Sequence, residues 1–141
     1  MRKIYNSFIT KSEADILLNL SNKKLLDSNN KIINKIIKQL KKDFDFNIKK
    51  ESNYQTEHYP HGHTWHIDTG INNHMPWCQI GVSILIKKPT LNGDTYYADD
   101  GKETNKVKVE RSLYDLIAHT SDEWHMVEPH KGERKVFLMF I

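Results

Sequence analysis

Five side chains that can bind a metal ion gather in residues 58–70, which read HYPHGHTWHIDTG. Histidines stand at positions 58, 61, 63 and 66, and an aspartate follows at position 68. Imidazole and carboxylate groups are common ligands of transition metals. The stretch can be interpreted as a four-histidine zinc cage, as an accidental metal-binding patch, or as two real ligands beside histidines with other roles.

The pair His66 and Asp68 has the spacing of two ligands on one strand. Alternate side chains of a strand share a face, so these two would point at one ion while Ile67 points away. The best third ligand is His125, in the later stretch WHMVEPHKGER. A jelly roll routinely places such distant strands side by side, and we therefore expect His66, Asp68 and His125 to bind one metal ion.

Two histidines and one carboxylate on one face of an ion leave open positions, an arrangement associated with non-haem Fe(II) oxygenases. Structural zinc sites instead close their shell with four ligands that typically include cysteine. Cys78 is the single cysteine, which disfavours the zinc cage. An organic co-substrate at the open positions would need an anchor, and Arg134, nine residues after His125, offers a forked donor that suits a carboxylate.

Other side chains compete for these roles. His61 and His63 are themselves spaced H-x-H beside a glycine, so they could ligate the metal or approach the co-substrate or substrate. Asp122 and Glu123 could replace Asp68 as the carboxylate. Ser83 and Thr95 could donate to the co-substrate, and Trp65 and Trp124 are expected to point away from the metal into packing. The remaining candidates are expected to be ordinary hydrogen-bonded or surface groups: His58, His74, His119, His130, Glu57 and Asp115.

The surrounding pattern predicts a mostly β fold with helices near the N-terminus. Thr10 and Glu13 have the form of a capping box before a helix at about 11–21, and apolar residues at helical spacing predict a second helix at about 29–44. Turn signals separate short apolar runs after residue 50. We expect eight strands, at about 53–59, 64–68, 78–87, 94–98, 106–110, 114–119, 124–128 and 134–141, forming a small jelly roll or barrel.

The length of 141 residues indicates one domain, 1–141, with 1–50 as helical support and 51–141 as the jelly-roll core. Residues 1–50 carry 12 Lys and Arg against 5 Asp and Glu, while the remainder carries 9 against 13. The basic third could bind a polyanion, although a solvated helix face explains it more simply. One cysteine and no long apolar run favour a cytoplasmic protein without a membrane span. The oligomeric state stays open.

An ordered set of motifs resembles the Fe(II)/2-oxoglutarate-dependent dioxygenases, especially their prolyl-4-hydroxylase-like branch. H-x-D at 66–68 is followed by H-x-V-x-P-x-x-G-x-R at 125–134. YPHGHTWHID resembles the stretch with a tyrosine and a glycine before H-x-D in this branch. VSILIKKPTLNGDTYY resembles its strand, proline and glycine-containing turn, and NSFITKSEADILLNL resembles its opening helix. The resemblance covers most of the chain.

This resemblance implies a double-stranded β-helix, a jelly roll that binds Fe(II) and 2-oxoglutarate and takes ascorbate as an optional reductant. Arg134 would pair with the distal carboxylate of 2-oxoglutarate, and Tyr59 would donate to a carboxylate unless it packs in the core. The implied activity is hydroxylation of a protein or peptide side chain, proline first, with succinate and carbon dioxide as co-products. A nucleobase or free amino acid substrate, and a non-catalytic metal-binding module, are the alternatives.

Overall fold

Two helices near the N-terminus form as the sequence pattern predicts. In the computed structural model, which describes residues 1–58, 61–70 and 74–141, α1 spans Lys11–Leu18 and α2 spans Lys31–Asp43. The Thr10 side chain caps α1 with the reciprocal Glu13 contact of a capping box. Asn30 caps α2 by accepting hydrogen bonds from the backbone of Ile32 and Ile33. Short 3₁₀ helices cover Leu25–Asp27 and Glu103–Asn105.

The major sheet contains six antiparallel strands in the order β1-β9-β5-β12-β3-β2. Its central strands are almost entirely apolar, as expected for strands that are buried on both faces. The strands of this sheet are β1 Arg2–Tyr5, β9 Leu116–Thr120, β5 Ile80–Lys87, β12 Lys135–Phe140, β3 Asn53–Glu57 and β2 Lys23–Lys24.

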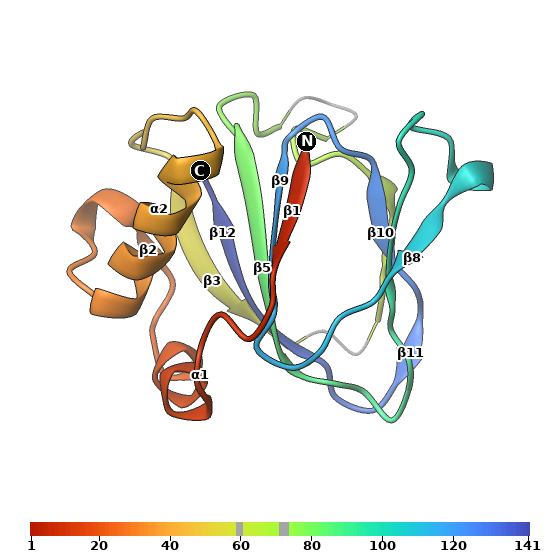
Figure 1. Ribbon diagram of the computed structural model, residues 1–141, viewed down its shortest axis with the longest axis horizontal. Coiled ribbons are helices and arrows are strands. Elements are labelled where there is room, and N and C mark those ends of the chain that lie inside the picture. Colours follow the sequence, from red (N-terminus) through yellow and green to blue (C-terminus); the bar gives the residue numbers. More distant parts are fainter. Residues whose placement is uncertain (59–60, 71–73) are drawn as a thin grey trace.

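A minor sheet of four antiparallel strands, in the order β4-β10-β7-β8, faces the major sheet. Figure 1 shows the two sheets side by side, with the helices outside the major one. The minor strands are β4 His63–His66, β10 His125–Val127, β7 Thr95–Tyr97 and β8 Val107–Val109. Two further short strands, β6 Leu91–Asn92 and β11 His130–Lys131, pair with each other.

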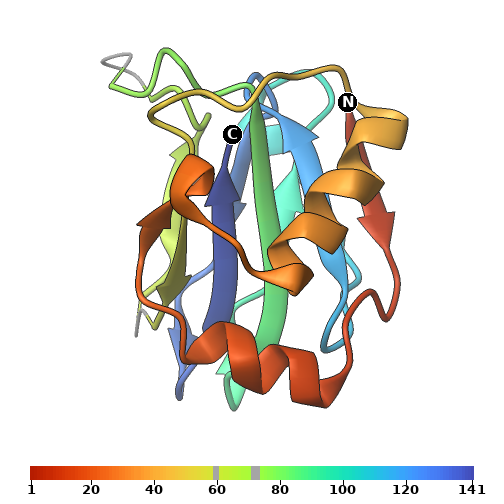
Figure 2. The same cartoon turned by 90° about the vertical axis from the view of Figure 1, so that its left-hand side faces the viewer.

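The main hydrophobic core lies between the helices and the outer face of the major sheet (Figure 2). The apolar side of α2, including Ile33, Ile36 and Leu40, is buried there with Phe137 of β12. The α2 lysines remain exposed. The inner face of the major sheet is thereby left to line the space between the two sheets, where the candidate site lies. No helix in the described part of the chain is long and apolar enough to cross a membrane.

The mostly β fold with N-terminal helices is confirmed, and the predicted strands appear with shorter bounds. The segments 2–5 and 23–24 add two strands to the major sheet that the apolar pattern did not indicate. Both are partly or fully exposed edge strands, so they lack the alternation that marks a half-buried strand.

Candidate metal centre

The pairing of β4 with β10 places two histidines directly opposite each other. His66 is the last residue of β4 and His125 is the first of β10, and they are cross-strand partners. Their ring centroids lie 4.3 Å apart. Residues that are distant in the sequence are thus brought to one point at the edge of the cavity between the sheets.

Asp68 completes the cluster, although it does not lie on the strand with His66. The strand ends at His66 and Asp68 lies in the following turn, so the expectation that both share one strand is wrong. The chain turns after β4, and Asp68 Oδ1 comes to 3.4 Å from Nε2 of His125 and 3.9 Å from Nε2 of His66. One ligand atom from each of these three residues lies within 4.8 Å of the others.

Hydrogen bonds orient both imidazole rings toward the cluster. Nδ1 of His66 lies 2.6 Å from the carbonyl oxygen of Thr64, and Nδ1 of His125 lies 2.8 Å from that of Glu123. A carbonyl oxygen can only accept, so each Nδ1 carries the proton and each Nε2 of a neutral ring presents a lone pair. Burial and the neighbouring His125 lower the pKa of His66, which favours this neutral form.

The second oxygen of Asp68 is held by a buried hydrogen-bond chain. Nε2 of His119 donates to Asp68 Oδ2 over 2.7 Å, and the Tyr97 hydroxyl donates to Nδ1 of His119 over 2.8 Å. Burial acts to raise the pKa of Asp68, but the hydrogen bond from His119 and the proximity of the His119 and His125 imidazoles outweigh it and hold this pKa well below its ordinary value. The carboxylate is therefore ionised and its Oδ1 is directed at the two histidines.

Gly81 of β5 leaves the space that this chain requires. A Cβ atom at this position would lie 2.1 Å from Asp68 Oδ2 and 2.5 Å from His119 Nε2. Gly81 is the cross-strand partner of His119 on one side and of Phe140 on the other. A side chain at position 81 would displace either the Asp68 carboxylate or the His119 imidazole. The site therefore requires a glycine at this position.

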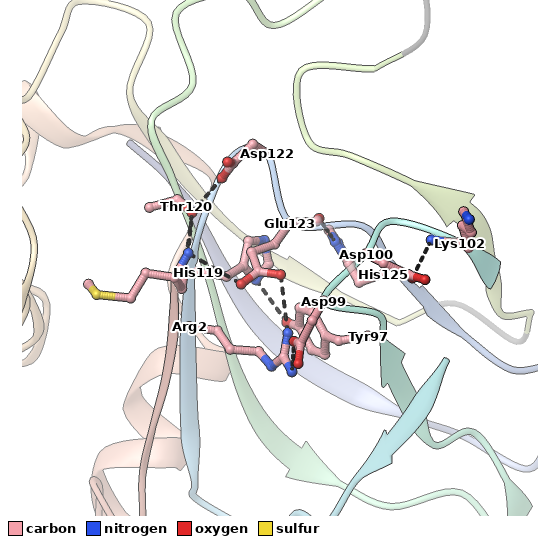
Figure 3. Close-up of polar contacts among 11 residues, drawn as sticks. Arg2, Tyr97, Asp99, Asp100, Lys102, His119, Thr120, Asp122, Glu123 and His125 are labelled. Atoms are coloured by element: carbon pink, nitrogen blue, oxygen red, sulfur yellow. Dashed lines mark hydrogen bonds and ion pairs between the residues drawn. The ribbon is translucent and has the colours of Figure 1, made fainter. Parts of the chain in front are cut away.

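An ion-pair cluster outside the cavity supports the backbone that positions His125. The Arg2 guanidinium donates to Glu123 over 3.1 Å and to Asp99 over 2.8 Å, and it lies 4.8 Å from the centroid of the Tyr97 ring. Figure 3 shows these contacts converging beside His119 and His125. Since the Glu123 carbonyl accepts the hydrogen bond from His125, Arg2 helps to fix one ligand.

A cavity of about 100 Å³ extends from the cluster between the two sheets. Its walls include the apolar side chains of Val127, Val136 and Leu138. Arg134, which is 6% exposed, enters the cavity, and its Nη2 lies 3.5 Å from Thr95 Oγ1. The predicted metal ligands and the predicted anion anchor therefore border one cavity.

The competing candidates take other positions. Asp122 accepts a hydrogen bond from Thr120, and Glu123 pairs with Arg2, so neither joins the cluster. His63 faces the cavity and pairs with Glu57, while His61 is exposed. Nδ1 of His130 donates to the Gly132 carbonyl away from the cluster. Tyr59 lies outside the described residues, and Trp65 stacks on Trp124 as expected, with ring centroids 6.2 Å apart.

Two carboxylates that were expected at the surface are buried. Glu57 is 7% exposed and faces the cavity beside His63, and Asp115 is 4% exposed and accepts from the backbone N–H groups of Ser7 and Ser112. The expectation failed because Glu57 ends β3 and Asp115 directly precedes β9, at positions whose side-chain direction depends on cross-strand packing. This packing cannot be predicted from the residues that neighbour Glu57 and Asp115 in the sequence.

Sequence reasoning missed four residues of the site: Tyr97, Gly81, Arg111 and the role of His119 beside Asp68. Of these four, Arg111 could have been singled out from the sequence, because the chain has only three arginines among many lysines. The other three are ordinary strand residues whose importance arises from contacts across the sheets.

Comparison with known proteins gives a likeness in structure without one in sequence. No protein-family model matches the chain, and no curated protein matches it significantly. A Pseudomonas putida prolyl-4-hydroxylase matches with a TM-score of 0.72 and 13% identity over 99% of this chain and 83% of its own. An oxidoreductase of the 2OG-Fe(II) oxygenase family from Burkholderia pseudomallei matches with a TM-score of 0.62 and 12% identity, over 99% and 82%.

A third match is a prolyl hydroxylase from Trichoplax adhaerens in complex with a peptide fragment of the hypoxia inducible factor oxygen degradation domain. Its TM-score is 0.65 at 14% identity, over 99% of this chain and 82% of the other. The chain therefore has the double-stranded β-helix fold of the 2-oxoglutarate- and Fe(II)-dependent oxygenases. It combines this fold with a His-Asp-His cluster of the kind that these enzymes carry.

Proposed function

We propose that this protein is an Fe(II)- and 2-oxoglutarate-dependent oxygenase that hydroxylates a protein or peptide side chain and releases succinate and carbon dioxide. The convergence of His66, Asp68 and His125 at a cavity that also holds Arg134 carries the proposal. The donor set fits Fe(II), because two neutral imidazoles and one carboxylate leave positions open for a co-substrate and dioxygen.

The protein residues have separate tasks in this reaction. His66 and His125 supply neutral Nε2 atoms, and Asp68 supplies an anionic oxygen that His119 holds in place. Bound Fe(II) would supply the activation of dioxygen, coupled to oxidative decarboxylation of 2-oxoglutarate. Arg134 would pair with the distal carboxylate and fix the orientation of the co-substrate.

The cavity walls would exclude water from the reacting groups. Val127, Val136 and Leu138 line the space between the cluster and Arg134. An apolar lining strengthens the electrostatic contacts inside it and suppresses side reactions with solvent. This protects a reactive site whose chemistry is provided by the metal.

A peptide substrate, with proline as the first choice, is supported by the names of the structural matches, because two of the three described above are prolyl hydroxylases. The basic residues of the N-terminal third would favour a nucleobase substrate if they lay beside the cavity. The α2 lysines instead lie on the outer side of the major sheet, with the sheet between them and the site (Figures 1 and 2).

The experiment is a succinate assay with purified protein, Fe(II), ascorbate and 2-oxoglutarate. Wild type is expected to form succinate, and His66→Ala, Asp68→Ala and Arg134→Ala are each expected to reduce turnover sharply. His74→Ala, which removes an exposed histidine, is the control and is expected to retain activity. Full activity in all three cavity variants would contradict the proposal.

The substrate is sought in a lysate incubated with the enzyme, by mass spectrometry of peptides that gain one oxygen atom. A proline-containing peptide is the expected product. Modified oligonucleotides or amino acids in place of modified peptides would contradict the peptide assignment. 2-Oxoglutarate turnover in the absence of any substrate would separate a catalyst from a module that only binds metal.

A further inference from the structure

A second arginine enters the same end of the cavity as Arg134. Arg111 lies between β8 and β9, and its guanidinium donates to the Ser83 hydroxyl over 3.2 Å and to the Ser83 carbonyl over 2.8 Å. A longer contact of 3.4 Å joins it to the Asp115 carbonyl. Its Nε is buried and has no hydrogen-bond partner in the described part of the chain.

Arg134, like Arg111, has a guanidinium whose hydrogen-bonding capacity is only partly used. Its Nε is also buried without a partner among the described residues, and its printed hydrogen bond ends on the Thr95 hydroxyl. Both arginines line the main cavity and an adjoining pocket. Burial and the positive charge of Arg134 together lower the pKa of Arg111 to about 10, in keeping with this proximity. Both remain protonated at neutral pH.

No ion pair joins either guanidinium to a carboxylate of the described residues. Asp115 acts on Arg111, and Glu57 and Asp94 act on Arg134, only at longer range. Asp115 accepts hydrogen bonds from the backbone N–H groups of Ser7 and Ser112. Glu57 pairs with His63. Every hydrogen bond that we find from the two guanidiniums therefore ends on a neutral oxygen. A guanidinium that is withdrawn from water without an opposite charge in contact is costly, which indicates that an anion belongs between Arg111 and Arg134.

The spacing of two residues on β5 gives the approximate separation of the anion position and the metal centre. On β5, Gly81 contacts the metal-ligand end, and Ser83, which holds Arg111, is the next residue on the same face. Two residues along a strand span about 7 Å. A five-carbon diacid can bridge that distance, with one end at the metal and a carboxylate at the arginines.

We propose that Arg111 and Arg134 together bind the distal carboxylate of a 2-oxo dicarboxylic acid, so that Arg111 is a second specificity-determining residue of the cavity. This inference rests on the proposed function, and it adds a second guanidinium, that of Arg111, to the anchor of the distal carboxylate. A 2-oxo monoacid of the same length would leave both guanidiniums without their anion and would bind weakly.

Binding is measured by calorimetry on protein loaded with Mn(II), so that no turnover is required. The two probes are 2-oxoglutarate and 2-oxopentanoate, which has the same carbon chain without the distal carboxylate. Arg111→Gln is expected to weaken 2-oxoglutarate binding about 10- to 100-fold, as for loss of a charge-assisted contact. Its affinity for 2-oxopentanoate is expected to stay unchanged.

Lys88→Gln is the matched control, because Lys88 is an exposed cation that lines an adjoining pocket together with Arg111 but does not line the main cavity. It removes the same charge and is expected to leave both affinities within about twofold of wild type, since exposed charges are screened. If Lys88→Gln lost as much affinity for 2-oxoglutarate as Arg111→Gln, the effect of Arg111 would be long-range electrostatics and not direct binding. That result would overturn the proposal.

Arg111→Lys tests the same point with a side chain that keeps the charge, in case Arg111→Gln does not fold. Lysine lacks the forked donor, so this variant is expected to lose several-fold in 2-oxoglutarate affinity. Wild-type preference for 2-oxoglutarate in every folded Arg111 variant would overturn the inference. If wild type still forms succinate in that case, the proposed function survives; a wild type that neither binds 2-oxoglutarate nor forms succinate would refute both.

Discussion

His119 donates a hydrogen bond of 2.7 Å to Oδ2 of Asp68, while Oδ1 of the same carboxylate is the oxygen nearest to His66 and His125. The two oxygens of Asp68 therefore have different partners. One is fixed by the protein and the other is available to an ion. Groups that orient a metal ligand in this way typically affect metal affinity strongly.

Replacing His119 by phenylalanine is expected to lower the affinity for Mn(II) about 10- to 100-fold, because Asp68 loses the donor that orients it. Calorimetric titration of Mn(II) measures the change. Tyr97→Phe, which removes only the hydroxyl that donates to Nδ1 of His119, is expected to have a smaller effect in the same direction. His74→Phe serves as the control, and unchanged affinity in His119→Phe would contradict the orienting role.

Gly81→Ala is expected to impair metal binding while the sheet still forms. The added methyl group would lie 2.1 Å from Asp68 Oδ2, so the carboxylate must move. Alanine is otherwise tolerated in a strand with ordinary backbone angles. Far-UV circular dichroism checks the fold, and a Mn(II) titration checks the site. A variant with native spectra and native metal affinity would show that Asp68 can shift without consequence.

Cys78 is expected to be unreactive in the native protein. Burial raises the pKa of its thiol to about 12, with a further contribution from the negative charge of Asp68. The reactive thiolate is then roughly a thousandfold scarcer at pH 8 than for a free cysteine. Iodoacetamide labelling followed by mass spectrometry should be very slow until urea unfolds the chain. Rapid labelling under native conditions would contradict this.

The same shift in Cys78 predicts how stability depends on pH. The folded pKa lies above the unfolded value of about 8.5, so the folded state retains a proton that the unfolded state loses. The stabilisation is fully present below about pH 8.5 and declines, by at most about 1.4 kcal/mol per pH unit, as the pH rises toward 12. Urea unfolding of wild type and Cys78→Ala at pH 7.5 and 10 measures it. The variant should show the shallower decline, and equal declines would be contrary to expectation.

Thr10→Ala is expected to lower the free energy of unfolding by about 1 kcal/mol, because it removes the N-cap of α1. The Glu13 side chain accepts from the Thr10 backbone N–H and pairs with Lys35, and these contacts lower the pKa of Glu13. Urea unfolding gives the change. The exposed Lys11→Ala substitution is the control, and an equal loss there would exclude a specific capping effect.

The sequence by itself determined both helices, most of the strands and several residues of the candidate site. Helical spacing of apolar residues and the capping box located both helices, since these signals act within one element. The ordered motifs around H-x-D and the later H-x-V-x-P-x-x-G-x-R pointed to His66, Asp68, His125 and Arg134. Each of these side chains is recognisable because its residue type is chemically distinctive and it stands in a short motif.

Only the tertiary structure decided how these residues meet and which others join them. The turn after β4 directs Asp68 at the two histidines, the pairing of β5 with β9 brings Gly81 beside His119, and the packing of the sheets brings Arg111 and Arg134 to one cavity. The physical reason is that strand register depends on contacts between residues far apart in the chain. A residue pattern shows which side chains share a face, whereas only the packing of the sheets determines what that face contacts.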